Sequence, residues 1–322
     1  MRQTKRYAPK KDLPSPAEII TNTIIAKLEE GVRPWRKPWT GTQAASPTRA
    51  CGTQYRGINR FWLALIADIN GYDSPYWMTY RQASELGGQV RKGERSTIAI
   101  FYRTYGKTTT DGYTGEETTE TRRVLKSYPV FSANQIDGLP DRFHPRPAPL
   151  PTAGQDPARL AELQAIFDKV PATVRHGGNE AFYSPGGDYI QLPVPEVFDT
   201  YEHYCATRAH ESIHWSGAPS RLNRDLSGRF GSDRYAIEEA IADLASAQVG
   251  VELGLPPEHL DDHASYIASW LRVLKADPRA LLTIASKAEE AATYVLRLAG
   301  RTTDEDEEVE EPQEETTSRV AA

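Results

Sequence analysis

The sequence predicts an α+β protein of two modules, because strand-like and helix-like segments are grouped along the chain rather than alternating. Residues 96–131 hold a stretch rich in β-branched and aromatic residues, whereas four helical patterns follow one another over 201–298. Six prolines within residues 139–157, with little periodicity, indicate a linker between the halves. We therefore expect a disordered basic tail over 1–15, modules over 16–138 and 158–300, the linker over 139–157, and a disordered acidic tail over 301–322.

The first module is expected to contain three helices and two strands. An apolar stripe at helical spacing predicts a helix over 16–30 that ends at Gly31. Shorter helices are expected at about 59–70 and 79–86, and strands at 96–105 and 124–131. The polar, Thr-rich segment 108–121 between those strands predicts a mobile hairpin loop.

The second module is expected to place a small sheet before a run of helices. A helix over 157–169 and a strand over 173–176 precede a hairpin formed by residues 181–183 and 189–192. Helices are then predicted at about 201–215, 235–253, 258–274 and 278–298.

The strongest motif lies on the first of these four helices, where residues 210–214 spell HExxH. Residues four apart share one face of a helix, so His210 and His214 can point ring nitrogens at one metal ion. Glu211, beside the first histidine, is placed to take a proton from a metal-bound water. The motif alone is also compatible with ordinary solvated side chains, so its neighbours decide how it is interpreted.

A third ligand is predicted on the following helix. Zinc (Zn²⁺) in a peptidase takes three protein ligands and keeps a fourth position for water. Glu239 and Asp243 share a face, and their Glu-x-x-Ala-Asp pattern resembles the glutamate helix of the gluzincin peptidases. That resemblance implies that Glu239 binds zinc and that Asp243 hydrogen-bonds the far nitrogen of His210. Glu238 is the alternative ligand.

Two other residues before the motif are interpreted as structural. His203, seven residues before His210, is expected to pack or to support a ligand. Cys205 is expected to be a small buried apolar residue, and with Cys51 in the other module it gives no disulfide framework.

Composition and cysteine usage indicate a cytoplasmic protein. The charge is divided unevenly along the chain, because residues 1–150 carry an excess of Lys and Arg and residues 151–322 an excess of Asp and Glu. The overall net charge is −6, so the split is hidden in the total. No run of eighteen apolar residues predicts a membrane span, and the N-terminus lacks the apolar stretch of a secretory signal. The basic half suits a polyanion as partner.

Aromatic and basic residues interleave in the first module, as they do in proteins that stack bases and neutralise phosphates of single-stranded nucleic acid. Trp77 and Tyr80 stand beside polar positions and are expected to be exposed, and a Gly-flanked turn carries Arg91 and Lys92. The candidate DNA-binding residues of this pattern are Trp35, Arg36, Arg56, Tyr76, Trp77, Tyr80, Arg91 and Lys92.

Residues 15–300 as a whole resemble the ArdC family of plasmid antirestriction proteins. The matching stretches are 34–39, 55–59, 74–77, 82–93 and 128–135 in the first half, and 208–217, 220–224 and 235–239 in the second. The resemblance implies a single-stranded-DNA-binding domain followed by a zincin-like metallopeptidase domain, in a protein that travels with mobile DNA and shields it from restriction. It adds Asn59 and Gln135 to the candidate DNA-binding residues. Ser212 and Ile213 stand where many relatives have Leu-Gly, but neither position is a ligand.

Three functions remain open at this point. The first is a metalloprotease that is tethered to single-stranded DNA and cuts an unidentified protein, for which restriction machinery is one candidate. Alternatively the chain coats DNA and its metal is structural or vestigial, or it is a metalloprotease toxin delivered during conjugation. Tyr235 or a nearby Arg or His is the candidate to stabilise an oxyanion, and the sequence does not choose among them.

Overall fold

The structure is a computed structural model, and it describes residues 14–31, 46–110, 117–145, 156–229, 231–256 and 263–301. The expected basic and acidic tails lie almost entirely outside these described residues. Among the helices within the described ranges, none combines the length and the apolar character needed to cross a membrane.

Local sequence signals explain the helices of the N-terminal half. Helix α1 (Pro16–Glu29) begins at Ser15, and Ser15 and Glu18 cap each other's backbone amides. Helix α2 (Ile58–Asn70) ends at Gly71, which adopts the left-handed conformation with φ 67°. The short helix α3 (Tyr80–Glu85) starts from a second reciprocal cap. These helices confirm the three predicted in this half.

The strands of the N-terminal half form two sheets, a four-stranded sheet and a two-stranded one. Their bounds are β1 Thr48–Arg49, β2 Tyr76–Met78, β3 Gln89–Val90, β4 Thr97–Thr110, β5 Glu117–Ser132 and β6 Ile136–Asp137. The order is β1-β2-β5-β4 in the larger sheet, and β3 pairs with β6 in the smaller one. Only β4 and β5 were predicted, because strands of two or three residues are too short to show a period of two.

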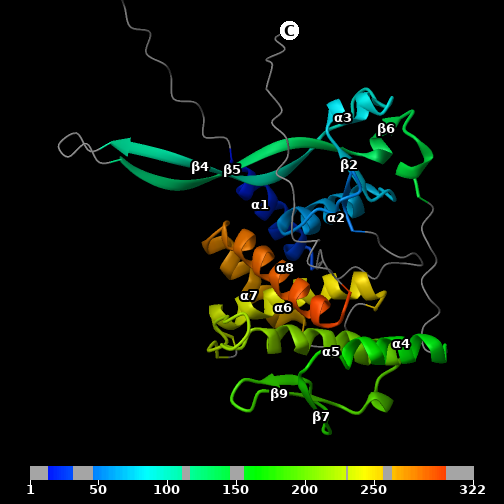
Figure 1. Cartoon of the computed structure of the whole chain (residues 1–322), viewed down its shortest axis with the longest axis vertical. Coiled ribbons are helices and arrows are strands. Elements are labelled where there is room, and N and C mark those ends of the chain that lie inside the picture. Colours follow the sequence, from blue (N-terminus) through cyan, green and yellow to red (C-terminus); the bar gives the residue numbers. More distant parts are fainter. Residues whose placement is uncertain are drawn as a thin grey trace, which may run out of the picture.

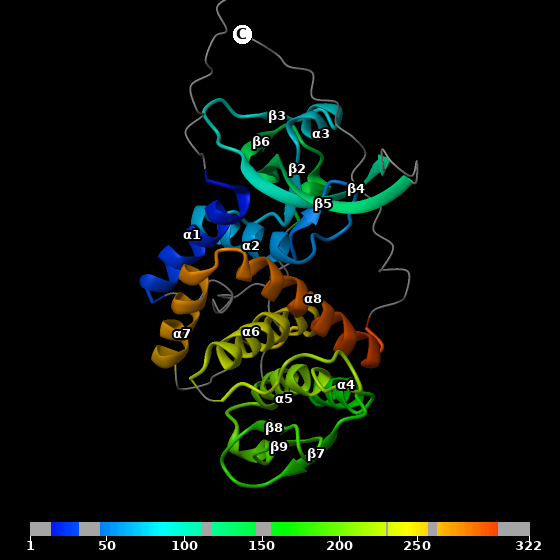
Figure 2. The same ribbon diagram turned by 90° about the vertical axis from the view of Figure 1, so that its left-hand side faces the viewer.

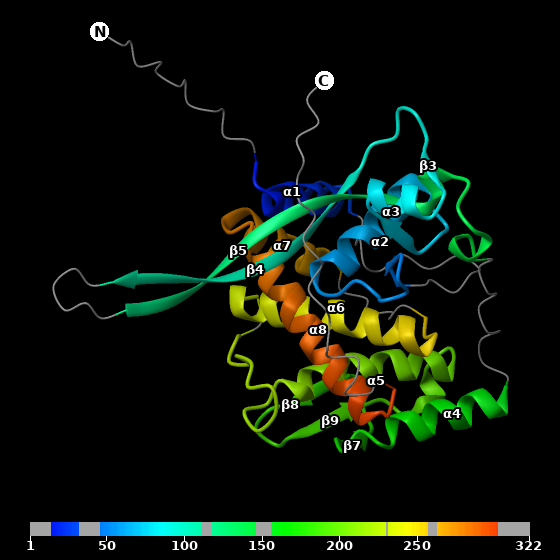
Figure 3. The same cartoon turned by 45° about the horizontal axis from the view of Figure 1, so that its top comes forward.

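Strands β4 and β5 form an antiparallel ribbon that projects beyond the rest of the molecule (Figure 1, Figure 3). Their register runs from Thr97 opposite Val130 out to Thr110 opposite Glu117. The prediction of a loop over 108–121 is therefore wrong for residues 108–110 and 117–121, which belong to the two strands. Threonine favours strands, and the hydrogen-bonded ladder continues through these Thr-rich segments. Residues 111–116 lie outside the described residues.

The C-terminal half places a small sheet before its main helices. Its elements are α4 Pro157–Phe167, β7 Thr173–His176, β8 Phe182–Ser184, β9 Tyr189–Leu192, α5 Tyr201–Ser216, α6 Asp233–Leu253, α7 His263–Ala276 and α8 Ala280–Leu298. The strand order is β7-β9-β8, with β7 parallel and β8 antiparallel to β9, so the predicted hairpin is confirmed. The predicted start of the helix over 258–274 lies outside the described residues.

Both halves contribute to one continuous hydrophobic core. Leu63 of α2 belongs to the same buried cluster as Leu244 of α6 and Ala288 of α8. Thr21 of α1 donates a hydrogen bond of 2.7 Å to the carbonyl of Pro278, just before α8. Helices α6, α7 and α8 lie between the N-terminal elements and the end formed by α5 and the small sheet (Figure 1, Figure 2). The N-terminal half therefore rests on the helical layer that includes α6.

The linker predicted over 139–157 is wrong for its first residues. Leu139 and Phe143 are buried in a second apolar cluster together with Met78. Ser74 donates a hydrogen bond of 2.6 Å to the carbonyl of Phe143, which lies in a short 3₁₀ turn. Burial of these two apolar side chains holds the segment to the N-terminal half despite its prolines. Residues 146–155 lie outside the described residues, so a linker there stays a prediction.

Candidate metal centre

Helix α5 supplies two imidazoles that point at each other. Thr200 caps its N-terminus by accepting a hydrogen bond from the amide of His203. The helix places His210 and His214 one turn apart, and their Nε2 atoms are 3.1 Å from each other. The two side chains are 3% and 12% exposed. The HExxH motif therefore forms the helical pair that its spacing predicts.

Helix α6 brings a carboxylate to the same place. The oxygens of Glu239 lie 3.8 Å from His210 Nε2 and 3.6 Å from His214 Nε2. One ligand atom from each of the three residues lies within 4.8 Å of the other two. The structure thus brings together the three side chains predicted as ligands. Two imidazole nitrogens and one carboxylate are a donor set that fits a divalent transition metal.

Each imidazole also has a carboxylate at its other ring nitrogen. Asp243 Oδ1 lies 3.7 Å from His210 Nδ1, next to the histidine that the sequence assigned to it. Glu238 Oε1 lies 3.2 Å from His214 Nδ1, whereas Glu239 lies near Nε2 of the same ring. Glu238, the alternative ligand, therefore contacts the other ring nitrogen of His214. This role of Glu238 was not predicted, because the helical phase of a residue alone does not distinguish a metal ligand from a residue that hydrogen-bonds a ligand.

Arg224 also belongs to the site, although no role was predicted for it from the sequence. It lies in the loop after α5 and makes hydrogen bonds of 2.8 and 3.0 Å to the two oxygens of Glu238. No helical or strand periodicity covers this loop. The only signal that pointed to it was the resemblance of residues 220–224 to the ArdC family.

The charges around the two imidazoles favour binding of a cation. Burial lowers the pKa of His214, but Glu239, the hydrogen bond to Glu238 and the charge of Glu211 outweigh burial and raise it. Burial raises the pKa of Glu238, but its hydrogen bonds with His214 and Arg224 outweigh burial and lower the pKa. The Glu238 carboxylate beside His214 is therefore held in its ionised form.

The remaining residues predicted on α5 occupy distinct positions. Glu211 is 4% exposed, and its charge acts on His214, so the candidate proton acceptor lies within the same buried region. His203 Nδ1 is 3.0 Å from Thr200 Oγ1 at the start of the helix, where it supports the cap. Cys205 is fully buried, which confirms its prediction as a small apolar residue.

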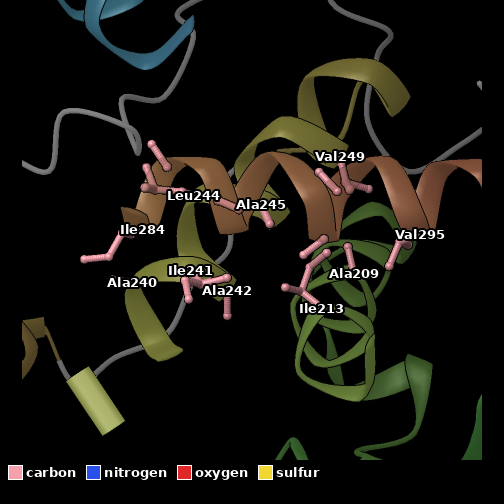
Figure 4. Packing of buried hydrophobic residues seen from close by; sticks show 14 of the residues in the cluster. Ala209, Ile213, Ala240, Ile241, Ala242, Leu244, Ala245, Val249, Ile284 and Val295 are labelled. Carbon is pink, nitrogen blue, oxygen red and sulfur yellow. The ribbon is translucent and has the colours of Figure 1, made fainter. Parts of the chain in front are cut away.

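Close packing of small and branched side chains holds α5, α6 and α8 together. The helices meet through residues that are each at most 4% exposed, namely Ala209, Ile213, Ala240, Ile241, Ala242, Leu244, Ala245, Val249, Ile284 and Val295 (Figure 4). Burying a side chain such as Leu or Ile contributes about 1.5–3 kcal/mol relative to leaving it exposed. The ligands therefore stand on two helices whose relative position is fixed by the core.

The candidate DNA-binding residues differ in their exposure. Tyr80 is 53% exposed and Lys92 is exposed. The Arg91 side chain is 43% exposed, and it forms ion pairs of 2.8 Å with Glu94 and 3.3 Å with Asp137. Arg56 and Tyr76 are half-buried, whereas Trp35 and Arg36 lie outside the described residues.

Three of the candidates are buried, and the expectation that one of them, Trp77, is exposed is wrong. Trp77 is 1% exposed, because its position on β2 opposite Ser132 turns it into the core. Asn59 is 8% exposed and makes two hydrogen bonds, of 2.6 and 2.8 Å, to the backbone of Ile100 on β4. Gln135 is 2% exposed and donates to the carbonyl of Arg95 at 3.0 Å. The side-chain amides of Asn59 and Gln135 are therefore engaged within the protein.

Comparison with known proteins identifies both halves. Residues 15–131 match the family model described as the N-terminal domain of anti-restriction factor ArdC, and residues 161–287 match the model of a zincin-like metallopeptidase. Among curated relatives, the uncharacterized protein y4eC of Sinorhizobium fredii (strain NBRC 101917 / NGR234) is 39% identical over 285 residues, 86% of this chain and 90% of that protein. DNA primase TraC of Escherichia coli is 36% identical over 299 residues, which is 87% of this chain but only 27% of the primase.

Solved structures give the same result. The metal-free crystal structure of the antirestriction protein ArdC from plasmid R388 has a TM-score of 0.76 and 41% sequence identity, and the match covers 89% of this chain and 98% of that chain. Its Mn(II)-bound structure has a TM-score of 0.72 and 39% identity, with coverage of 89% and 99%. The chain belongs to the ArdC family of antirestriction proteins, and its C-terminal half is a zincin-like domain that implies a divalent metal.

Proposed function

We propose that this chain protects incoming DNA from restriction by binding single-stranded DNA and by cutting a protein at a metal-dependent peptidase site. The observation that carries the proposal is the convergence of His210, His214 and Glu239 within 4.8 Å. We propose Zn²⁺ as the metal, because two imidazoles and one carboxylate are the ligands of many zinc peptidases. The Mn(II) in a relative's structure belongs to that protein, and the same donor set accepts either ion.

The chain's own residues would divide the work around such a metal. A divalent ion bound there would supply Lewis acidity to water and to a substrate carbonyl. His210, His214 and Glu239 would hold the ion. Asp243 and Glu238, which lie at the Nδ1 atoms of the two histidines, would orient the imidazoles. Glu211 would accept the proton of the attacking water and deliver it to the leaving amine. Its burial within the site, where its charge acts on His214, supports this role.

Single-stranded DNA is the partner we propose for the N-terminal half. The exposed ring of Tyr80 offers a surface on which a base can stack, and Lys92 with Arg91 supplies charge for phosphates. Arg56 and Tyr76 are the half-buried members of the same set. The protein substrate is not identified by these features, and restriction machinery is the first candidate because of the family.

The test is a protection assay with Glu211→Gln, which keeps the size of the side chain and removes its basicity. The assay measures the survival of unmodified plasmid DNA that enters a restricting host, and the metal content of each purified variant is measured in parallel. We expect Glu211→Gln to lose protection while it retains metal. The matched control is Glu196→Gln, the same change at an exposed site of the same half, which is expected to protect like wild type.

Coating of DNA is the second candidate, and the excess of Lys and Arg in residues 1–150 favours it. If Glu211→Gln binds metal and still protects fully, peptide hydrolysis is not the mechanism. Protection should then depend on the N-terminal half, and replacing Tyr80 and Lys92 by alanine should weaken both single-stranded-DNA affinity and protection.

A further inference from the structure

The guanidinium of Arg224 is buried beneath the C-terminal end of α5 and is fully engaged there. Its side chain is 2% exposed. Nε and Nη2 donate to the two oxygens of Glu238 at 3.0 and 2.8 Å, Nη1 donates to Ser216 Oγ at 3.0 Å, and Nη2 also donates to the carbonyl of Ile213 at 2.6 Å. A bidentate pair of this kind fixes the plane of the carboxylate as well as its position.

Glu238 transmits that position to a metal ligand. The oxygen that accepts from Arg224 Nη2 is also the oxygen that lies 3.2 Å from His214 Nδ1. A neutral imidazole carries its hydrogen on only one ring nitrogen, and an ionised carboxylate accepts hydrogen bonds but cannot donate them. A neutral His214 that donates to Glu238 therefore carries its hydrogen on Nδ1. Its Nε2 lone pair is then directed toward Glu239 and His210, where a metal would be held.

Arg224 is needed because Glu238 is itself buried, with a side chain only 9% exposed. An uncompensated carboxylate in such a place carries a large desolvation cost, and it rotates toward other donors to reduce that cost. Such a rotation would remove the fixed acceptor from His214 Nδ1. The arginine thus stabilises both the charge and the orientation on which the histidine depends.

The loop between α5 and α6 is built to bring Arg224 to this position. Asn223 adopts the left-handed conformation with φ 49°, which turns the chain back under the helix. The amide of Arg224 donates to the carbonyl of Gly217 at 2.9 Å. A Cβ atom at Gly217 would lie 2.8 Å from Arg224 Nη2, so the absence of a side chain there leaves room for the guanidinium.

We propose that Arg224 is a positioning residue of the metal centre, acting through Glu238 to hold His214 in the tautomer that presents Nε2 to the metal. The inference rests on the proposed function in one respect, namely that His214 is a metal ligand. It adds to that function a residue outside both ligand helices.

The first experiment compares the affinities of wild type, Arg224→Met and Arg221→Met for Zn²⁺ and for Mn²⁺, measured by competition with a chelating dye. Arg221 is the matched control, because it is in the same loop and pairs with a carboxylate, Asp188, that touches no ligand. We expect Arg224→Met to bind both metals about 10- to 100-fold more weakly. Arg221→Met should bind like wild type, even if it lowers thermal stability.

The outcomes separate this inference from the function on which it rests. If wild type binds neither metal, the proposed metal site fails. If wild type binds metal and folded Arg224→Met binds it equally well, the positioning role of Arg224 is overturned. A loss of affinity that is equal in both arginine variants would show a general effect of loop stability and would also overturn it.

A second measurement covers the case in which Arg224→Met does not fold. Arg224→Lys keeps a positive charge but lacks the planar fork, so it should fold and allow Glu238 to rotate. The ¹⁵N shifts of the His214 ring, measured on metal-free protein at a pH where the ring is neutral, report its tautomer. We expect hydrogen on Nδ1 in wild type and a mixture of tautomers in Arg224→Lys. Identical tautomers in the two proteins would refute the proposal.

Discussion

Truncation of Glu289 tests how strongly the two halves of the chain depend on each other. This carboxylate of α8 accepts a hydrogen bond of 3.1 Å from the amide of Gly57 and lies 3.4 Å from Arg60 Nη2. Gly57 begins α2 without a side chain that could cap the helix, so Glu289 supplies the negative charge that a helix N-terminus favours. Glu289→Ala leaves that amide and the buried guanidinium without this partner.

The expected loss follows from these contacts. A hydrogen bond to a charged group contributes about 1.5–3 kcal/mol, and breaking a fully buried ion pair costs about 3–5 kcal/mol. The side chains of Arg60 and Glu289 are 10% and 15% exposed, so the pair keeps some solvent screening. We therefore expect the free energy of unfolding to fall by about 2–4 kcal/mol in Glu289→Ala.

The assay is urea unfolding followed by tryptophan fluorescence and far-ultraviolet circular dichroism on the same samples. Because the core is continuous, we expect both signals to show one transition, with a lower midpoint and an unchanged slope in the variant. Glu290→Ala is the control on the same helix, since its exposed ion pair with Lys287 is worth below about 0.5 kcal/mol. Equal midpoints for the two variants, or separate transitions for the two signals, would refute this reasoning.

The remaining predictions concern the cysteines and one glycine. At mildly alkaline pH a thiol reagent should modify the exposed Cys51 quickly and leave Cys205 unmodified in the folded protein. The reason is that burial raises the pKa of Cys205 to about 12. Equal rates of modification at the two cysteines, measured by mass spectrometry, would contradict this. Gly217→Ala should cost about 1–3 kcal/mol by overpacking against Arg224. The same variant should weaken metal binding in the direction expected for Arg224→Met, and unchanged affinity in a folded variant would contradict the close approach of the guanidinium.

Much of the fold could be predicted because its helices carry strong local signals. The reciprocal cap of Ser15 and Glu18 marks the start of α1, and Gly71 marks the end of α2. Each signal is contained within a few consecutive residues of the sequence. The candidate ligands could be predicted for the same reason, since His210 and His214 are neighbours on any helix. The resemblance to the gluzincin glutamate helix pointed to Glu239, and the packing of α6 against α5 decided between it and Glu238.

Features that depend on distant segments could not be predicted. Trp77 looked exposed from its polar neighbours, but the pairing of β2 with β5 turns it inward. Phe143 looked like part of a linker, but it fills a cluster with Met78 and Leu139. In each case the burial of apolar surface against residues far along the chain outweighs the local pattern.

The sequence by itself determined most of the helices and the pairing of His210 with His214, because these follow from short-range periodicity. The resemblance to the gluzincin glutamate helix pointed to Glu239 as the third ligand and left Glu238 as the alternative. Only the tertiary structure decided that Glu238 faces His214 and that Arg224 holds Glu238. Those contacts join a helix, a loop and a second helix, and their geometry is set by how the helices pack. Packing depends on the whole core, and so no local stretch of sequence specifies it.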